Sequence, residues 1–200
     1  MKKTTITALC LLSLNVWADL DRDITQPIRI GITDNTGSEM GLSFIQPNEH
    51  GWNLKRKGAE VSLEKFGETN DEGKQIEGYI IRLDSPVEPL ENYMAQIKKN
   101  TYQGYKNTRF NIKNFDVKPD PNHARCVRMH LLLEDRKPVR TVDHDQKKYS
   151  EQYTLSCGLE KHKGMGVELR LYDRYYEQNK DVKLAEVANT LFDSIVIDDK

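Results

Sequence analysis

The residues of this sequence that most clearly indicate a chemistry are two cysteines. Cys126 and Cys157 lie in the segments 126–135 and 152–160, where apolar and polar residues alternate as they do in β-strands. If these segments pair as a hairpin with the cysteines opposite each other, a disulfide can form. The spacing is not Cys-x-x-Cys, which argues against a redox-active pair. We therefore predict a structural disulfide, contributing about 3–4 kcal/mol.

That pairing register contains a conflict. It places Arg128 opposite Leu155 on the face of the cysteines, while the apolar side of the first strand faces Thr154 and Ser156. Three arrangements would resolve the conflict. A bulge could shift the register, both faces of the sheet could be covered, or the cysteines could meet across strands that are not neighbours.

Histidines near the cysteines raise the alternative of a metal site. The possible ligands are His123, Cys126 and His130, with Cys157 or His162 as a fourth. Zinc would need thiolates, which an oxidising compartment makes scarce. We therefore expect no metal and no cofactor.

A carboxylate beside an imidazole, as in Asp143-His144-Asp145, is one part of a catalytic triad. Adjacent loop residues point apart, however, and no serine lies in a Gly-x-Ser-x-Gly context. We expect a protein that is not an enzyme. The alternative is a hydrolase that uses His144 or His130 with carboxylates.

Three aromatic residues are candidates for contact with a partner. Trp52 follows Gly51, and Tyr175 and Tyr176 are adjacent. Tryptophan and tyrosine often anchor protein interfaces, although covering a core is their more frequent role.

The first residues are typical of an export signal. Lys2 and Lys3 precede a short apolar run, and 16–18 forms a small-residue cleavage site. Cleavage before a lipidated Cys10 is an alternative, but Leu9 occupies the place where that processing needs a small residue. We expect residues 1–18 to be a signal peptide and 19–200 to be one domain that is periplasmic or fully secreted.

Charge and hydropathy argue against a nucleic-acid partner and against a membrane-spanning segment. The formal net charge is −1, and removal of the two lysines of the signal brings it to about −3. A near-neutral balance argues against nucleic acid as the partner. No run after the signal approaches transmembrane length, so we expect no integral membrane segment.

The remaining periodicities predict an α+β fold with seven or eight strands. Helical spacing of apolar residues appears in two segments, Leu90 to Tyr105 and Asp181 to Phe192, with Asp181 as the expected N-cap of the second. Alternation predicts strands in the segments 28–32, 42–45, 51–55, 59–83 as a hairpin, 107–119 and 164–176, in addition to the cysteine strands, and a last strand over 194–197. We expect an antiparallel-rich sheet covered by these two helices.

The order of these elements resembles the PsbP-like fold. The residues that carry the resemblance are Gly51-Trp52, the break Ser85-Pro86 before a long helix, and the closing segment 191–197, LFDSIVI. The PsbP-like group includes extrinsic photosystem proteins and periplasmic DcrB-type proteins of bacteria. The resemblance covers most of residues 19–200 as topology and implies a largely non-catalytic protein that docks on other proteins. It carries no binding residue over to this sequence.

We therefore expect an exported, non-catalytic protein that binds a protein partner in the cell envelope. The partner would be an envelope complex of which this chain is an accessory subunit, or an antibacterial effector that it neutralises as an immunity protein. Alternatives are a periplasmic protein that binds a small ligand or a metal, and a periplasmic hydrolase.

Overall fold

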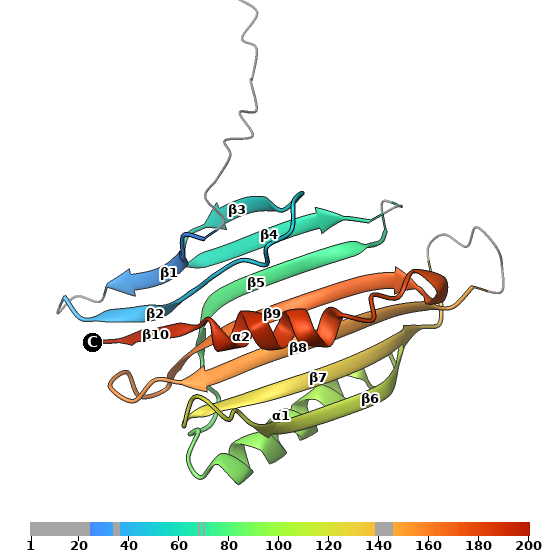
Figure 1. Ribbon diagram of the computed structural model, residues 1–200. Helices are drawn as coiled ribbons and strands as arrows, with labels where there is room; N and C mark the ends of the chain where they lie inside the picture. Colours follow the sequence, from blue (N-terminus) through green and yellow to red (C-terminus); the bar gives the residue numbers. More distant parts are fainter. Residues whose placement is uncertain (1–24, 34–36, 68, 70, 139–145) are drawn as a thin grey trace, which may run out of the picture.

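The computed structural model describes residues 25–33, 37–67, 69, 71–138 and 146–200. A large antiparallel sheet, seven-stranded in the described residues, forms the centre of the molecule (Figure 1). In spatial order its strands are β3 (Asn53–Lys57), β4 (Glu60–Phe66), β5 (Gly73–Arg82), β9 (Met165–Tyr176), β8 (Lys148–Gly158), β7 (Cys126–Asp135) and β6 (Phe110–Pro119).

A second sheet of three described strands packs on one face of the large sheet. It consists of β1 (Ile28–Thr33), β2 (Glu39–Phe44) and β10 (Val196–Asp199), with β2 in the middle and antiparallel to both neighbours. The first and last strands of the described chain thus lie in one small sheet. Gly78 of β5 makes the close approach possible, since a Cβ at this position would lie 2.3 Å from Cδ1 of Ile30.

The two helices cover opposite faces of the large sheet. Helix α2 (Leu184–Asp193) lies beside the small sheet, and Figure 1 shows both on the same side of the large sheet. Helix α1 (Leu90–Tyr105) packs on the other face, against β6 and β7. The main core lies between the two sheets and α2, and a smaller apolar cluster lies under α1.

Strict alternation accounts for most strands, and one irregularity has a local cause. In β9 the residues Val167, Leu169 and Leu171 are buried in the main core, as expected for a strand of period two. In β6 the apolar residues change parity, from Phe110 and Ile112 to Phe115 and Val117. The register between β6 and β7 shifts between Ile112 and Asn114, so a bulge restores all four side chains to the face of α1.

The predicted architecture is confirmed in its main features: α+β, antiparallel, with two helices. It differs in having a second sheet beside α2, and ten strands instead of seven or eight in the described residues. Helix α2 also begins later than expected, because Lys183 occupies the N-cap position. The carboxylate of Asp181 accepts the backbone N–H of Lys183 at 2.8 Å, so Asp181 closes the turn before the helix.

The expected signal peptide, residues 1–18, lies outside the described residues, as does Asp143-His144-Asp145. No helix in the described ranges combines the length and apolar character that a bilayer span requires. A three-residue 3₁₀ turn, η1 (Glu177–Asn179), links β9 to the segment before α2.

Candidate functional site

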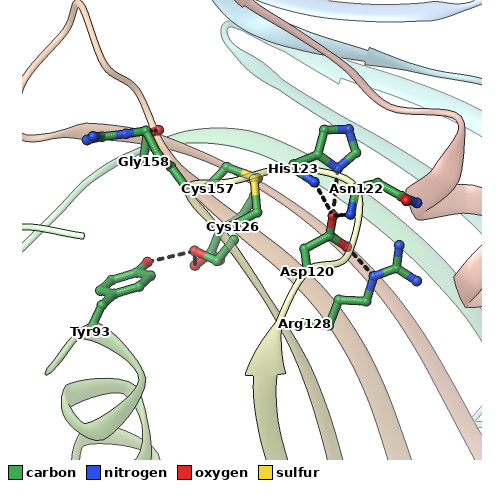
Figure 2. The surroundings of a disulfide bond; sticks show 11 residues. Tyr93, Asp120, Asn122, His123, Cys126, Arg128, Cys157 and Gly158 are labelled. Carbon is green, nitrogen blue, oxygen red and sulfur yellow. Dashed lines mark hydrogen bonds and ion pairs between the residues drawn. A yellow bond between two sulfur atoms is a disulfide. The ribbon is translucent and has the colours of Figure 1, made fainter. Parts of the chain in front are cut away.

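The two cysteines form the predicted disulfide. Cys126 and Cys157 are directly opposite each other in the antiparallel pair β7–β8, with Cα atoms 4.1 Å apart and sulfurs 2.08 Å apart (Figure 2). Both side chains are buried in the main core. The disulfide therefore joins two neighbouring strands of the large sheet, at the end where β7 begins and β8 finishes.

The register conflict is resolved by cover on both faces, without a bulge in β7–β8. Leu155 lies in the main core, and Arg128, opposite it, reaches α2. On the other face Val127 packs under α1, and the Tyr93 hydroxyl of α1 lies 2.8 Å from the Ser156 hydroxyl (Figure 2). The polar side of β8 thus meets a polar group of the helix that covers it.

The residues considered as metal ligands have other partners. The disulfide uses both thiols, and His123 and His162 each bond a carboxylate, at 2.8 Å to Asp120 and 2.7 Å to Asp199. Within the described ranges, no group of three or more His, Cys, Asp or Glu residues is placed to hold a metal ion.

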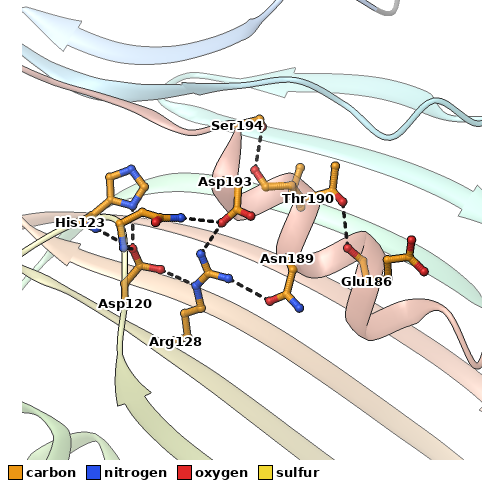
Figure 3. Close-up of polar contacts among 10 residues, drawn as sticks. Asp120, His123, Arg128, Glu186, Asn189, Thr190, Asp193 and Ser194 are labelled. Carbon is orange, nitrogen blue, oxygen red and sulfur yellow. Dashed lines mark hydrogen bonds and ion pairs between the residues drawn. The ribbon is translucent and has the colours of Figure 1, made fainter.

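Arg128 connects α2 to the large sheet through hydrogen bonds. Its guanidinium donates to the carboxylate of Asp120, to Oδ1 of Asn189 at 2.9 Å and to Oδ1 of Asp193 at 2.6 Å (Figure 3). Burial alone would raise the pKa of Asp120, but hydrogen bonds from Arg128, His123 and the backbone lower it. The ion pair thus holds the C-terminal turn of α2 against β7.

His130 lies in a second polar network on the same face of the sheet. Its Nε2 donates to Glu151 at 2.8 Å, Asn114 donates to its Nδ1 at 3.2 Å, and its ring stacks on Tyr153 at 4.4 Å. A catalytic base needs a free ring nitrogen, and here both are occupied. The geometry thus gives the hydrolase hypothesis no support at His130, and His144 lies outside the described residues.

Glu151 is enclosed by donors. His130, Tyr153 and Tyr175 donate to its carboxylate at 2.7–3.0 Å. Burial alone would raise its pKa, yet these hydrogen bonds lower it to about 2. Glu151 is therefore a satisfied, ionised group that joins three strands.

Asp173 of β9 lies opposite Glu151 in the sheet, but its pKa is shifted in the opposite direction. Asp173 is 5% exposed, and burial, aided by the nearby carboxylates, raises its pKa to about 6. It lines a hollow of about 320 Å³ between the β4–β5 hairpin and the turn before α2, together with Lys74, Tyr175 and Asp181. The sequence carries a signal for this site, because Asp173 falls at an inward position of the β9 alternation.

Replacing Asp173 with asparagine is expected to stabilise the protein at neutral pH by about 1–3 kcal/mol. The folded pKa lies above the ordinary value of 3.8, so ionisation of Asp173 disfavours the folded state as pH rises from about 4 to 6. The gain should therefore appear above pH 6 and vanish near pH 4. Thermal unfolding of both proteins across pH 4–8 measures it.

Asp181→Asn is the matched control with the opposite sign. Asp181 accepts hydrogen bonds from Lys74 and from the backbone of Lys183, which outweigh burial and lower its pKa. Its contribution is present above the ordinary carboxyl pKa and lost as pH falls, so the variant should be destabilised at pH 7. A pH-independent effect of Asp173→Asn would contradict the assignment.

A second hollow, of about 410 Å³, lies along the outer side of α2. Its walls come from the loop after β2 and from α2, and the apolar side chains among them are those of Ile45, Pro47, Val187 and Leu191. We call this hollow the α2 groove. The ion pair of Lys65 with Glu49, at 2.6 Å, and the turn 181–183 separate it from the hollow at Asp173.

The three aromatic candidates lie apart. Tyr175 and Tyr176 are only 3% and 2% exposed and, as neighbours in β9, point to opposite faces; Tyr175 donates to Glu151 at 2.7 Å, and Tyr176 donates to Asp71 at 3.1 Å. Trp52 is partly buried against the main core. Of the three, Tyr175 lines one of the two hollows, that at Asp173.

No protein-family model and no curated protein sequence matches the chain. Among solved structures, the crystal structure of LpqN, "involved in cell envelope biogenesis of Mycobacterium tuberculosis", has a similar fold. Its TM-score is 0.51 at 10% sequence identity, over 86% of this chain and 92% of that chain. This likeness concerns the fold alone, and the predicted PsbP-like relationship stays a prediction.

Proposed function

We propose that this chain is an exported, non-catalytic protein that works in the cell envelope, in the periplasm, by binding another protein. Two observations support export. The chain has a buried disulfide, which is typical of proteins from oxidising compartments, and its fold is similar to that of a protein of cell envelope biogenesis. The second observation comes from fold analogy.

The α2 groove is the observation that carries the binding proposal. Charged residues make up 30% of the sequence, yet this groove presents Ile45, at 43% exposed, with Pro47 and the half-buried Val187. Val182, two residues before the first residue of α2, is 85% exposed. Apolar side chains gathered in a concave surface are typical of contact sites for other molecules.

Site-specific photocrosslinking in native cells tests this proposal. A photoreactive amino acid at Val182 or Val187, in the full chain at native abundance, is expected to give one dominant adduct with a single partner. Mass spectrometry of the adduct identifies the partner. A toxin would indicate an immunity protein, and a resident envelope protein would indicate an accessory subunit.

Tyr102 supplies the matched control position. It is 54% exposed and lies on α1, which covers the opposite face of the large sheet. The same photoreactive residue there should not give the adduct. Equal adducts from both faces, or none from the α2 positions, would contradict binding at the α2 groove.

A further inference from the structure

Asp173 lies buried without a partner of its own. Among the described residues, no hydrogen bond or ion pair reaches its carboxylate, although it is only 5% exposed. Buried polar groups nearly always have partners, and a carboxylate without one calls for an explanation such as a ligand that the site is built to hold.

Each of the other buried carboxylates in the described chain has at least one hydrogen-bond donor or cationic partner. Glu72, in the same hollow, accepts the backbone N–H of Tyr176 at 3.1 Å, the Asn179 amide at 2.9 Å and the Thr69 hydroxyl at 2.8 Å. The remaining ones also have donors: Asp120 and Glu151 as described above, Asp135 from Arg109, and Glu168 from Ser156. Asp173 is thus the exception within the described chain.

The charges around the hollow leave it negative. Lys74 faces Asp173 across β5–β9, but its ammonium is bound by Asp181, and the ammonium of Lys65 is bound by Glu49. With these two pairs internally neutral, the carboxylates of Glu72 and Asp173 remain. Arg174 also lines the hollow, but its exposed side chain points to the opposite face of β9 from Asp173, by the alternation of a strand.

A catalytic pair is the competing explanation, since Glu151 and Asp173 are neighbours whose pKa values are pushed apart. Glu151 does not line the hollow, however, and three donors occupy its carboxylate. Of the pair Glu151 and Asp173, a substrate in the hollow would reach only Asp173. The arrangement favours binding of a cation over acid–base catalysis.

We propose that the hollow at Asp173 receives a lysine or arginine side chain of the protein partner, whose cationic group pairs with the Asp173 carboxylate. The inference rests on the proposed function, because it takes the hollow and the α2 groove, which lie on either side of the Lys65–Glu49 pair, as two parts of one docking surface. The partner would lay apolar side chains along α2 and insert one basic side chain beyond the Lys65–Glu49 pair. A hollow of about 320 Å³ accommodates a single side chain of this size.

The pairing should depend on pH. The charged groups facing Asp173 are Lys74 of β5, Glu151 of β8, Glu72 of the β4–β5 turn and Asp181 before α2. Because the pKa of Asp173 is about 6, a proton competes with the incoming cation below this pH. Affinity should therefore be about tenfold weaker at pH 5 than at pH 7.5.

Nuclear magnetic resonance titration of the folded, disulfide-bonded protein tests the inference with defined probes. These are Nα-acetyl-lysine methylamide and Nα-acetyl-arginine methylamide, with Nα-acetyl-methionine methylamide as the neutral control. Either basic probe should cause saturable shifts at Asp173, Lys74 and Asn179, with a millimolar dissociation constant and the stated pH dependence. The neutral probe should not.

Asp173→Asn, which is expected to fold and to be more stable at neutral pH, should abolish these shifts. Shifts that do not saturate, that persist in Asp173→Asn, or that are equal for the neutral probe would overturn the inference.

A second measurement separates failure of the inference from failure of the proposed function. The photocrosslinking residue at Val182 is placed in the Asp173→Asn background, where capture of the partner should fall at least tenfold. Unchanged capture would overturn the inference and leave the proposed function standing. Saturable probe binding without any captured partner would contradict the proposed function and leave Asp173 as a cation site.

Discussion

Replacing Arg128 with alanine is expected to lower the free energy of unfolding by about 3–5 kcal/mol. Its guanidinium is nearly buried and pairs with the fully buried carboxylate of Asp120. Truncation removes that counter-charge and leaves Asp120 with hydrogen bonds from His123 and from the backbone of Asn122. A buried charge without a counter-charge costs far more folding free energy than the ion pair did.

The same substitution also removes two hydrogen bonds between α2 and the sheet. Asn189 and Asp193, on the last two turns of the helix, lose the donor that ties them to β7 (Figure 3). The α2 groove is built on this helix, so capture of a partner through Val182 or Val187 should also decline. Urea denaturation of the oxidised variant and wild type measures the stability change directly.

The pH dependence gives the Arg128→Ala prediction a second readout. In the wild type the pKa of Asp120 is below its ordinary value, so its contribution is present above that value and lost as pH falls through the folded pKa. In the variant burial acts without the arginine, so the pKa of Asp120 should rise. The difference between the proteins should therefore shrink from pH 7 to pH 4.

Arg29→Ala is the control for Arg128→Ala. Arg29 also makes two ion pairs, with Glu39 at 2.7 Å and Asp198 at 3.1 Å, but its side chain is 55% exposed. Solvent screens exposed ion pairs, so this variant should be destabilised far less than Arg128→Ala. Comparable losses in the two variants would show that Arg128 acts only as a surface residue.

The sequence predicts those parts of the fold that depend on local alternation. The cysteine register is an example. Once Cys126 is placed opposite Cys157, all the remaining residue pairs between β7 and β8 follow correctly. Even the conflict that this register creates is informative, because cover on both faces of the sheet is one of the three arrangements that resolve it. In the structure, α2 covers the face of Arg128 and accepts its hydrogen bonds.

The small sheet could not be predicted in the same way. Its strands β1 and β10 lie at the two ends of the described chain and meet through β2. Local periodicity indicates that each segment is a strand but does not indicate which strands pair, since pairing depends on the packing of the whole core. The partners of Arg128 and the hollow at Asp173 arise from contacts of the same long-range kind.

Removing the disulfide is expected to lower the free energy of unfolding by about 3–4 kcal/mol. The bond closes a loop between residues separated by 31 positions, so it restricts the unfolded chain far more than a short link would. The measurement is urea denaturation of a Cys126→Ala/Cys157→Ala variant against the oxidised wild type. A loss below 1 kcal/mol would contradict a structural role.

Reduced wild type separates the cross-link from the packing around it. Reduction removes the covalent bond but keeps both sulfurs in the main core, whereas the alanine variant also leaves a small cavity there. Equal losses in the two forms would assign the stabilisation to the cross-link. A much larger loss in the alanine variant would assign it to packing of the sulfurs, and the fold would then no longer depend on an oxidising compartment, which is one of the two supports for export.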